Sequence, residues 1–135
     1  MLNITGVVKN ELNMTTLNSG VVASGLNEFF DGPGPFTVFA PSNLAFGKLE
    51  SGIMENLLKP ENKKELVNLL KQHAVHGKIN FKDLKDGEKL KSLNDTELMV
   101  QVKNNKITID GATIQNRDVE ALNGVIHSLD AVLKN

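Results

Sequence analysis

Side chains of the kinds used in hydrolysis come closest together near the end of the sequence, where His127 is followed by Ser128 and Asp130. In a catalytic triad, histidine takes the proton from a serine nucleophile and an acid orients the imidazole. These three residues lie on one predicted strand, however, and the alternation of a strand points Ser128 and Asp130 away from His127. The chain also lacks the Gly-x-Ser-x-Gly sequence of a nucleophile elbow. The residues therefore argue against an enzyme.

Two other local patterns could indicate chemistry, and neither is complete. His73 and His76 would share one side of a helix, but Gly77 ends the helix and no third ligand is close in sequence. The run Gly32-Pro33-Gly34-Pro35 precedes a predicted strand, whereas a phosphate loop follows one and ends in Gly-Lys-Ser/Thr. We therefore expect no metal and no cofactor.

His73 falls on an apolar helical stripe with Leu66, Leu69 and Leu70. A histidine in such a place is usually a packed core group whose ring nitrogens bond backbone or hydroxyl groups. We interpret it as tying this helix to neighbouring strands, with a surface role as the alternative.

The composition is that of an ordinary globular chain of one domain, residues 1–135. Hydrophobic residues make up 40% and charged residues 23% of the 135, and the net charge is -1. Arg117 is the only arginine, which weakens any case for nucleic acid. Lysines between 59 and 91 interleave with acids, which favours a solvated face of mixed charge over a heparin-type patch. No apolar run approaches the length of a membrane span, so we expect no direct membrane insertion.

Hydrophobic periodicity predicts helices mainly in the first half of the chain. Ala40-Pro41 should end a strand, and Ser42 should cap the helix that follows. Gly20 and Gly25 weaken the first predicted helix. The predicted helices are 15–30, 43–49, 51–58, 61–74 and a single turn at 80–84.

The second half is richer in strands. Leu98, Val100 and Val102 alternate with Met99 and Gln101. Asn104-Asn105 then predicts a hairpin turn, because asparagine tolerates positive φ. The predicted strands are 36–39, 75–79, 89–93, 98–102, 107–109, 112–115 and 124–133. Helices followed by strands indicate an α+β fold with sheets packed against a helical side.

Three blocks of sequence, in order and in register, carry a family resemblance. They are Phe-Thr-Val-Phe-Ala-Pro-Ser-Asn-Leu-Ala-Phe at 36–46, Leu-Leu-Lys-Gln-His-Ala-Val at 69–75 with Gly-Lys-Ile at 77–79, and Asn-Gly-Val-Ile-His-Ser-Leu-Asp-Ala-Val-Leu at 123–133. Together they are similar to the conserved blocks of the fasciclin (FAS1) family. The resemblance implies a wedge of about seven β-strands in two packed sheets, with several short helices along one side. It implies structural roles in the conserved motifs for His73, Phe39, Pro41, Asn43, Phe46, Asn123, Gly124 and His127.

The same resemblance implies a non-catalytic adhesion module on secreted, cell-surface or cell-envelope proteins, with a matrix or cell-surface protein or glycan as partner. In some animal members, a Tyr-His pair and an Asp-Ile pair have been linked to integrin binding. The corresponding residues here are Gln72-His73, without the tyrosine, and Asp118-Val119. Asp118, Val119 and Gln72 are therefore the candidate partner-binding residues.

Two alternatives stay open. Asp118 follows Arg117 in a predicted loop, where it could be a solvated surface acid or a carboxylate offered to a receptor. The domain could instead carry a small molecule or lipid in a cleft between the sheets and the helix predicted at 51–58.

Overall fold

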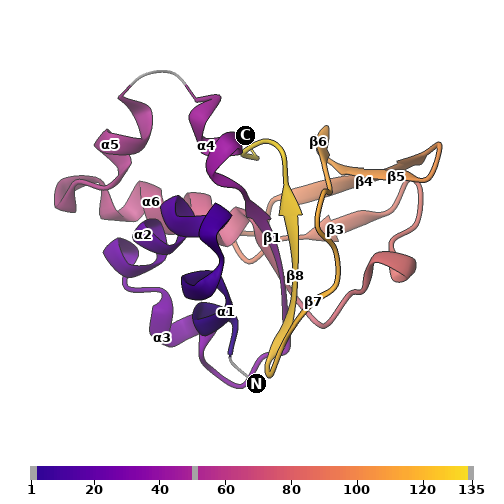
Figure 1. Ribbon diagram of the computed structural model, residues 1–135, viewed down its shortest axis with the longest axis horizontal. Coiled ribbons are helices and arrows are strands. Elements are labelled where there is room, and N and C mark those ends of the chain that lie inside the picture. Colours follow the sequence, from indigo (N-terminus) through magenta and orange to yellow (C-terminus); the bar gives the residue numbers. More distant parts are fainter. Residues whose placement is uncertain (1–2, 50–51, 134–135) are drawn as a thin grey trace.

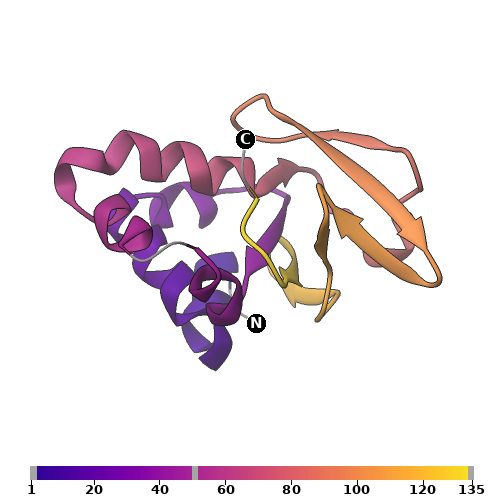
Figure 2. The same ribbon diagram turned by 90° about the horizontal axis from the view of Figure 1, so that it is seen from above.

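Three layers make up the computed structural model, which describes residues 3–49 and 52–133. A helical layer packs on one side of a four-stranded sheet, and a second four-stranded sheet lies beyond it (Figures 1 and 2). The helical segments are α1 (Ile4–Asn10), η1 (Leu12–Met14), α2 (Thr15–Ser24), α3 (Asn27–Phe30), α4 (Asn43–Gly47), α5 (Ile53–Leu57), η2 (Pro60–Asn62), α6 (Lys63–Gln72) and η3 (Phe81–Asp83). The strands are β1 (Phe36–Pro41), β2 (Ala74–His76), β3 (Lys89–Lys91), β4 (Glu97–Lys103), β5 (Lys106–Ile109), β6 (Ala112–Thr113), β7 (Val119–Ala121) and β8 (Gly124–Leu129).

The first sheet has the order β2-β1-β8-β7, and its centre joins distant parts of the chain. β1 pairs antiparallel with β2 and parallel with β8, in a register that runs from Phe36 beside Gly124 to Pro41 beside Leu129. All six residues of β1 and all six of β8 are buried, because helices cover one face and the second sheet covers the other. These two strands form the central layer of the molecule.

The second sheet has the order β3-β4-β5-β6 and is antiparallel throughout. The predicted hairpin is confirmed: β4 and β5 are joined by Asn104 and Asn105, at φ 53 and φ 65. Bridges between Val75 and Ser92 and between Ile114 and Leu129 link this sheet to the first.

Each interface between layers has its own hydrophobic core. Val38 and Ala40 of β1 pack with the helices, whereas Phe39 packs with the second sheet. The α+β architecture with two sheets and a helical side is as predicted, and the described residues form eight strands rather than about seven. Within the described residues, no helix is long and apolar enough to cross a membrane.

Several predicted boundaries are corrected. The helix predicted over 15–30 is two helices, because Gly25 adopts a left-handed conformation at φ 78 after α2. The helix predicted over 61–74 stops at Gln72, and the strand predicted over 124–133 stops at Leu129. β7 had no strong sequence signal, since it is only three residues long.

Candidate functional site

His73 lies directly after α6 and is 2% exposed. Its Nδ1 lies 2.8 Å from the Leu69 carbonyl oxygen, and its Nε2 accepts the Leu133 N–H at 2.8 Å. Nε2 can accept only when it carries no proton, so Nδ1–H donates to Leu69 and the ring is neutral. The His73 carbonyl accepts the Phe39 N–H at 2.7 Å. One residue therefore connects α6, β1 and the segment after β8.

Burial lowers the pKa of His73 from 6.5 to about 4, although the Leu69 hydrogen bond raises it in part. Because the folded pKa lies below the unfolded value, the unfolded chain takes up the proton first as the pH falls below 6.5. We expect the free energy of unfolding to drop by roughly 2 kcal/mol between pH 7 and pH 5 from this group alone. Urea unfolding at several pH values in that range measures it.

His127 contributes in the same direction, since burial also lowers its pKa. His73→Gln should therefore flatten the dependence of the unfolding free energy on pH relative to wild type. The same pH slope in His73→Gln and in wild type would contradict the core position of His73.

His127 occupies the centre of the sheet, 0% exposed, with its ring stacked on Phe39 at 5.8 Å between centroids. Its Nε2 lies 2.8 Å from the Ile79 carbonyl oxygen, and its Nδ1 accepts the Asp118 N–H at 3.1 Å. Ser128 and Asp130 instead accept the N–H groups of Asn116 and Thr113, both at 2.8 Å. The three side chains thus bond separate backbone groups, and no hydrogen bond between two of them is found in the described chain.

The other motif residues lie in the core or form hydrogen bonds between neighbouring segments. Pro41 is buried at the end of β1, and Phe46 is buried in the core under the helices. The Ser42 hydroxyl accepts the Ala45 N–H and caps α4 as predicted. Asn43 reaches across to α2, where its Oδ1 accepts the Thr16 N–H at 3.0 Å and its Nδ2 donates to Thr15 Oγ1 at 2.9 Å.

Asp118 is exposed, but its carboxylate and its backbone N–H both form hydrogen bonds within the fold. It adopts a left-handed conformation at φ 55, and its Oδ1 accepts the Phe81 N–H at 2.8 Å. Its own N–H is held by His127. The carboxylate is therefore fixed in place by contacts to η3 and β8, which the sequence did not reveal.

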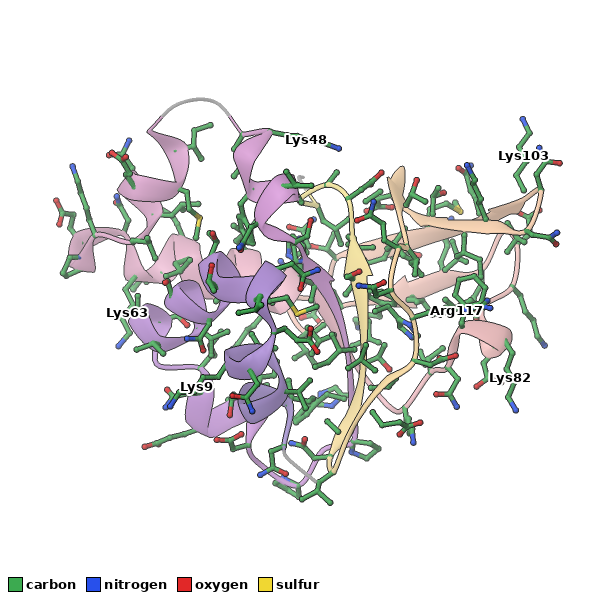
Figure 3. The ribbon with its side chains drawn as sticks, viewed as in Figure 1. Lys9, Lys48, Lys63, Lys82, Lys103 and Arg117 are labelled. Carbon is green, nitrogen blue, oxygen red and sulfur yellow. The ribbon has the colours of Figure 1, made fainter. Side chains whose placement is uncertain are left out.

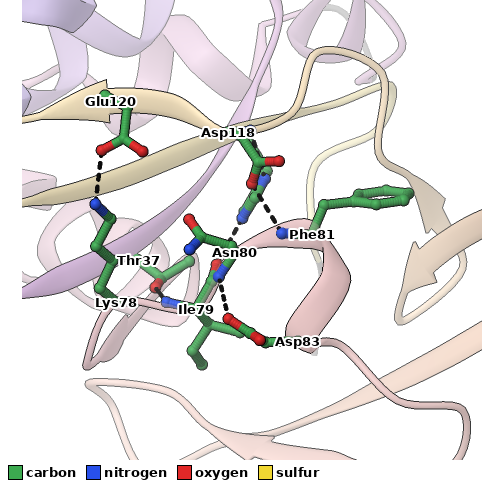
Figure 4. A network of polar contacts seen from close by, with 9 residues as sticks. Thr37, Lys78, Ile79, Asn80, Phe81, Asp83, Asp118 and Glu120 are labelled. Atoms are coloured by element: carbon green, nitrogen blue, oxygen red, sulfur yellow. Dashed lines mark hydrogen bonds and ion pairs between the residues drawn. The ribbon is translucent and has the colours of Figure 1, made fainter.

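The segment 77–81 completes the surroundings of Asp118 (Figure 4). Thr37 of β1 binds it through two hydrogen bonds: its hydroxyl donates to the Gly77 carbonyl at 2.7 Å and accepts the Ile79 N–H at 2.8 Å. At the surface, the Lys78 ammonium pairs with the Glu120 carboxylate at 2.6 Å. The segment is thus tied to β1, β7 and β8 together.

An open hollow of about 390 Å³ lies against this carboxylate. The Arg117 guanidinium stands over the Phe81 ring, 4.2 Å from its centroid, a cation–π contact that orients both groups. We call this surface the Asp118 face; its lining residues are Asn80, Phe81, Lys82, Arg117, Asp118 and Glu120. These contacts thus hold positively and negatively charged side chains at defined positions on the surface.

The other two candidate residues are not presented in the same way. Val119 is half-buried and packs against the core under the helices. Gln72 is 2% exposed, and its Nε2 has no hydrogen-bond partner. The expectation that Gln72 offers a contact surface is therefore corrected, because a partner could not reach a side chain that is buried at the end of α6.

Phe81, Asn80 and Glu120 were missed as site residues because no motif marks them. The parallel pairing of β1 with β8 and the turn after β2 bring them to Asp118. Among the described residues, no group of three histidine or acidic side chains is arranged to hold a metal ion.

Comparison with known proteins gives a consistent family assignment. The family model described as Fasciclin domain matches residues 12–135. The chain is 42% identical over 132 residues to Protein sll1483 of Synechocystis, covering 98% of this chain and 73% of that protein. It is 36% identical to the pig transforming growth factor-beta-induced protein ig-h3, covering 97% of this chain and 19% of that protein.

A solved structure shares the architecture. It is a FAS1 domain pair from the insect cell adhesion molecule Fasciclin I, with a TM-score of 0.88 and 19% identity, covering 99% of this chain and 51% of that one. At this identity the likeness shows the fold.

Proposed function

Because the chain belongs to the fasciclin domain family, we propose that it is a non-catalytic adhesion module that works at the cell surface, in the cell envelope or in the extracellular matrix. The solved relative of the same fold is described as a cell adhesion molecule. The observation that carries the proposal is the rigid Asp118 face, where an exposed carboxylate is held beside Arg117 and Phe81. Such a surface suits a protein or glycan partner, bound weakly by one domain and more strongly by repetition or display.

A carrier role has less support. The cavity enclosed between the helices and β1 has about 10 Å³, which holds one water at most. Apolar side chains line it almost completely. Beside the helix predicted at 51–58, where the lipid cleft was expected, Met54 and Leu57 of α5 pack against the same hydrophobic core.

The proposal is tested by attachment of cells or matrix extract of the source organism to the immobilised domain. Saturable attachment, abolished by excess soluble domain, is expected. No attachment at high surface density would overturn the adhesion role while leaving the family assignment intact.

The contacts of Asp118 predict how a substitution there affects stability. Asp118→Ala should lower the free energy of unfolding by about 1–2 kcal/mol, because alanine is strained at φ 55 and leaves the Phe81 N–H without its acceptor. Asp118→Asn should cost less than about 0.5 kcal/mol, since asparagine tolerates this conformation and keeps an amide oxygen. Urea unfolding of the two variants separates these values, and equal losses would contradict the assigned contacts.

A further inference from the structure

The outer face of the second sheet differs in charge from the chain as a whole. Strand alternation buries Leu90, Leu98 and Ile107 and turns their neighbours outward. The outward residues are Lys89, Lys91, Glu97, Met99, Gln101, Lys103, Lys106, Thr108 and Thr113. Four are lysines and one is an acid, on a chain whose net charge is -1. We call this surface the lysine face.

Lys103 and Lys106 stand directly opposite each other in the register of β4 and β5. Like charges in such a cross-strand pair destabilise a sheet. In the described part of the chain neither lysine forms an ion pair, and the ion pairs found are Lys78–Glu120 and Lys91–Asp95. The hairpin therefore places two positive charges side by side, and no ion pair in the described residues offsets their repulsion.

The pair borders an open hollow of about 600 Å³ on the lysine face. Its lining residues are Asp86, Gln101, Val102, Lys103, Asn104, Lys106, Thr108 and Thr113. Amide and hydroxyl groups thus lie next to the two ammonium groups. The one carboxylate in the lining, Asp86, accepts the Val102 N–H at 2.9 Å and so bonds the strand edge.

Lys89 stands opposite Met99 and adds a third ammonium group on β3, whereas Lys91 stands opposite Glu97 and forms an ion pair with Asp95. From Glu97 to Lys103, β4 spans about 20 Å. Figure 3 shows Lys103 at the tip of the hairpin, far from Lys63 on the helical side. Among the described residues, the lysines of this face that form no ion pair are therefore Lys89, Lys103 and Lys106.

We propose that the lysine face binds an acidic polysaccharide, laid across β4 and β5 with its anionic groups against Lys103 and Lys106. Charge complementarity favours a polyanion, and the amide and hydroxyl groups of Gln101, Thr108 and Thr113 suit sugar hydroxyls. None of the residues that define this face is aromatic, so none can stack on bases or anchor in a membrane. Its apolar side chains are the half-buried Met99 and, in the lining of the hollow, Val102 at 37% exposed. This surface is separate from the Asp118 face, and its partner does not depend on that assignment.

Binding of polygalacturonate, heparin and neutral dextran to the whole domain tests the proposal, by calorimetry at low and moderate salt. At least one of the two acidic polymers should bind, more weakly as salt rises, and dextran should not. The double variant Lys103→Gln, Lys106→Gln should lose affinity about tenfold or more. It should fold at least as stably as wild type, because it removes the like-charge pair.

The control is Lys63→Gln, Lys64→Gln, which removes the same charge at the start of α6. It should leave polysaccharide binding unchanged. Equal losses in both lysine pairs, no binding of either acidic polymer, or equal binding to anionic phospholipid vesicles would each overturn the proposal.

Discussion

Gly124→Ala should prevent the two central strands from pairing and lower the free energy of unfolding by at least about 3 kcal/mol. Gly124 stands beside Phe36 in the parallel register of β8 with β1. A Cβ added there would lie 2.0 Å from the Phe36 carbonyl oxygen and 2.9 Å from its carbonyl carbon. Both atoms belong to the backbone of a buried strand, so no side chain can move to make room. Urea or thermal unfolding would measure the loss.

Gly47→Ala is the matched control. Gly47 ends α4, and an added Cβ there meets no atom within 4 Å. Alanine is also the better helix former, so this variant should be neutral or slightly more stable. If Gly124→Ala were as stable as Gly47→Ala, the close approach of β8 to β1 would be wrong.

Asn123→Ala should cost roughly 3–5 kcal/mol, because it leaves three backbone groups unpaired. The Asn123 Oδ1 accepts the Ile4 N–H at 3.0 Å. Its Nδ2 donates to the carbonyls of Phe30 and Gly32, the latter at 2.9 Å. One amide therefore joins the start of α1, the end of α3 and the turn into β8. The expected loss is in the free energy of unfolding.

Hydrogen exchange shows whether the loss is local to these elements. Amides of α1 should exchange faster in Asn123→Ala than in wild type, even at temperatures where the sheets stay protected. Asn13→Ala, at an exposed position in η1, should change neither stability nor exchange of α1. Unchanged protection of α1 in Asn123→Ala would contradict this role.

Much of the architecture could be predicted from local signals. The Asn104-Asn105 turn, the Ser42 cap and the alternation through Leu98 and Val100 act over a few residues, and each predicts its own element. Boundaries were less accurate where tertiary contacts decide them. The chain after Gln72, for example, leaves the helix because Ala74 and Val75 pair with β1.

The Asp118 face could be predicted only in part. The sequence indicated that Asp118 lies in a loop beside Arg117. It did not indicate that Phe81, 37 residues before Asp118, and His127, 9 residues after it, form the hydrogen bonds that fix this loop. Gln72 was misjudged because the helical pattern does not reveal what covers the end of α6. Contacts of long sequence separation are a property of the topology, not of any motif.

The central claim, an adhesion module that uses the carboxylate of Asp118, is tested most directly by attachment of source cells or matrix extract to immobilised wild type and Asp118→Asn. Asp110→Asn is the control, because Asp110 is also exposed, also has positive φ, and also accepts a backbone N–H, from Met99. We predict that Asp118→Asn folds normally and attaches at least several-fold more weakly, whereas Asp110→Asn attaches like wild type. Attachment of Asp118→Asn at the wild-type level would contradict the account and move the contact surface elsewhere on the domain.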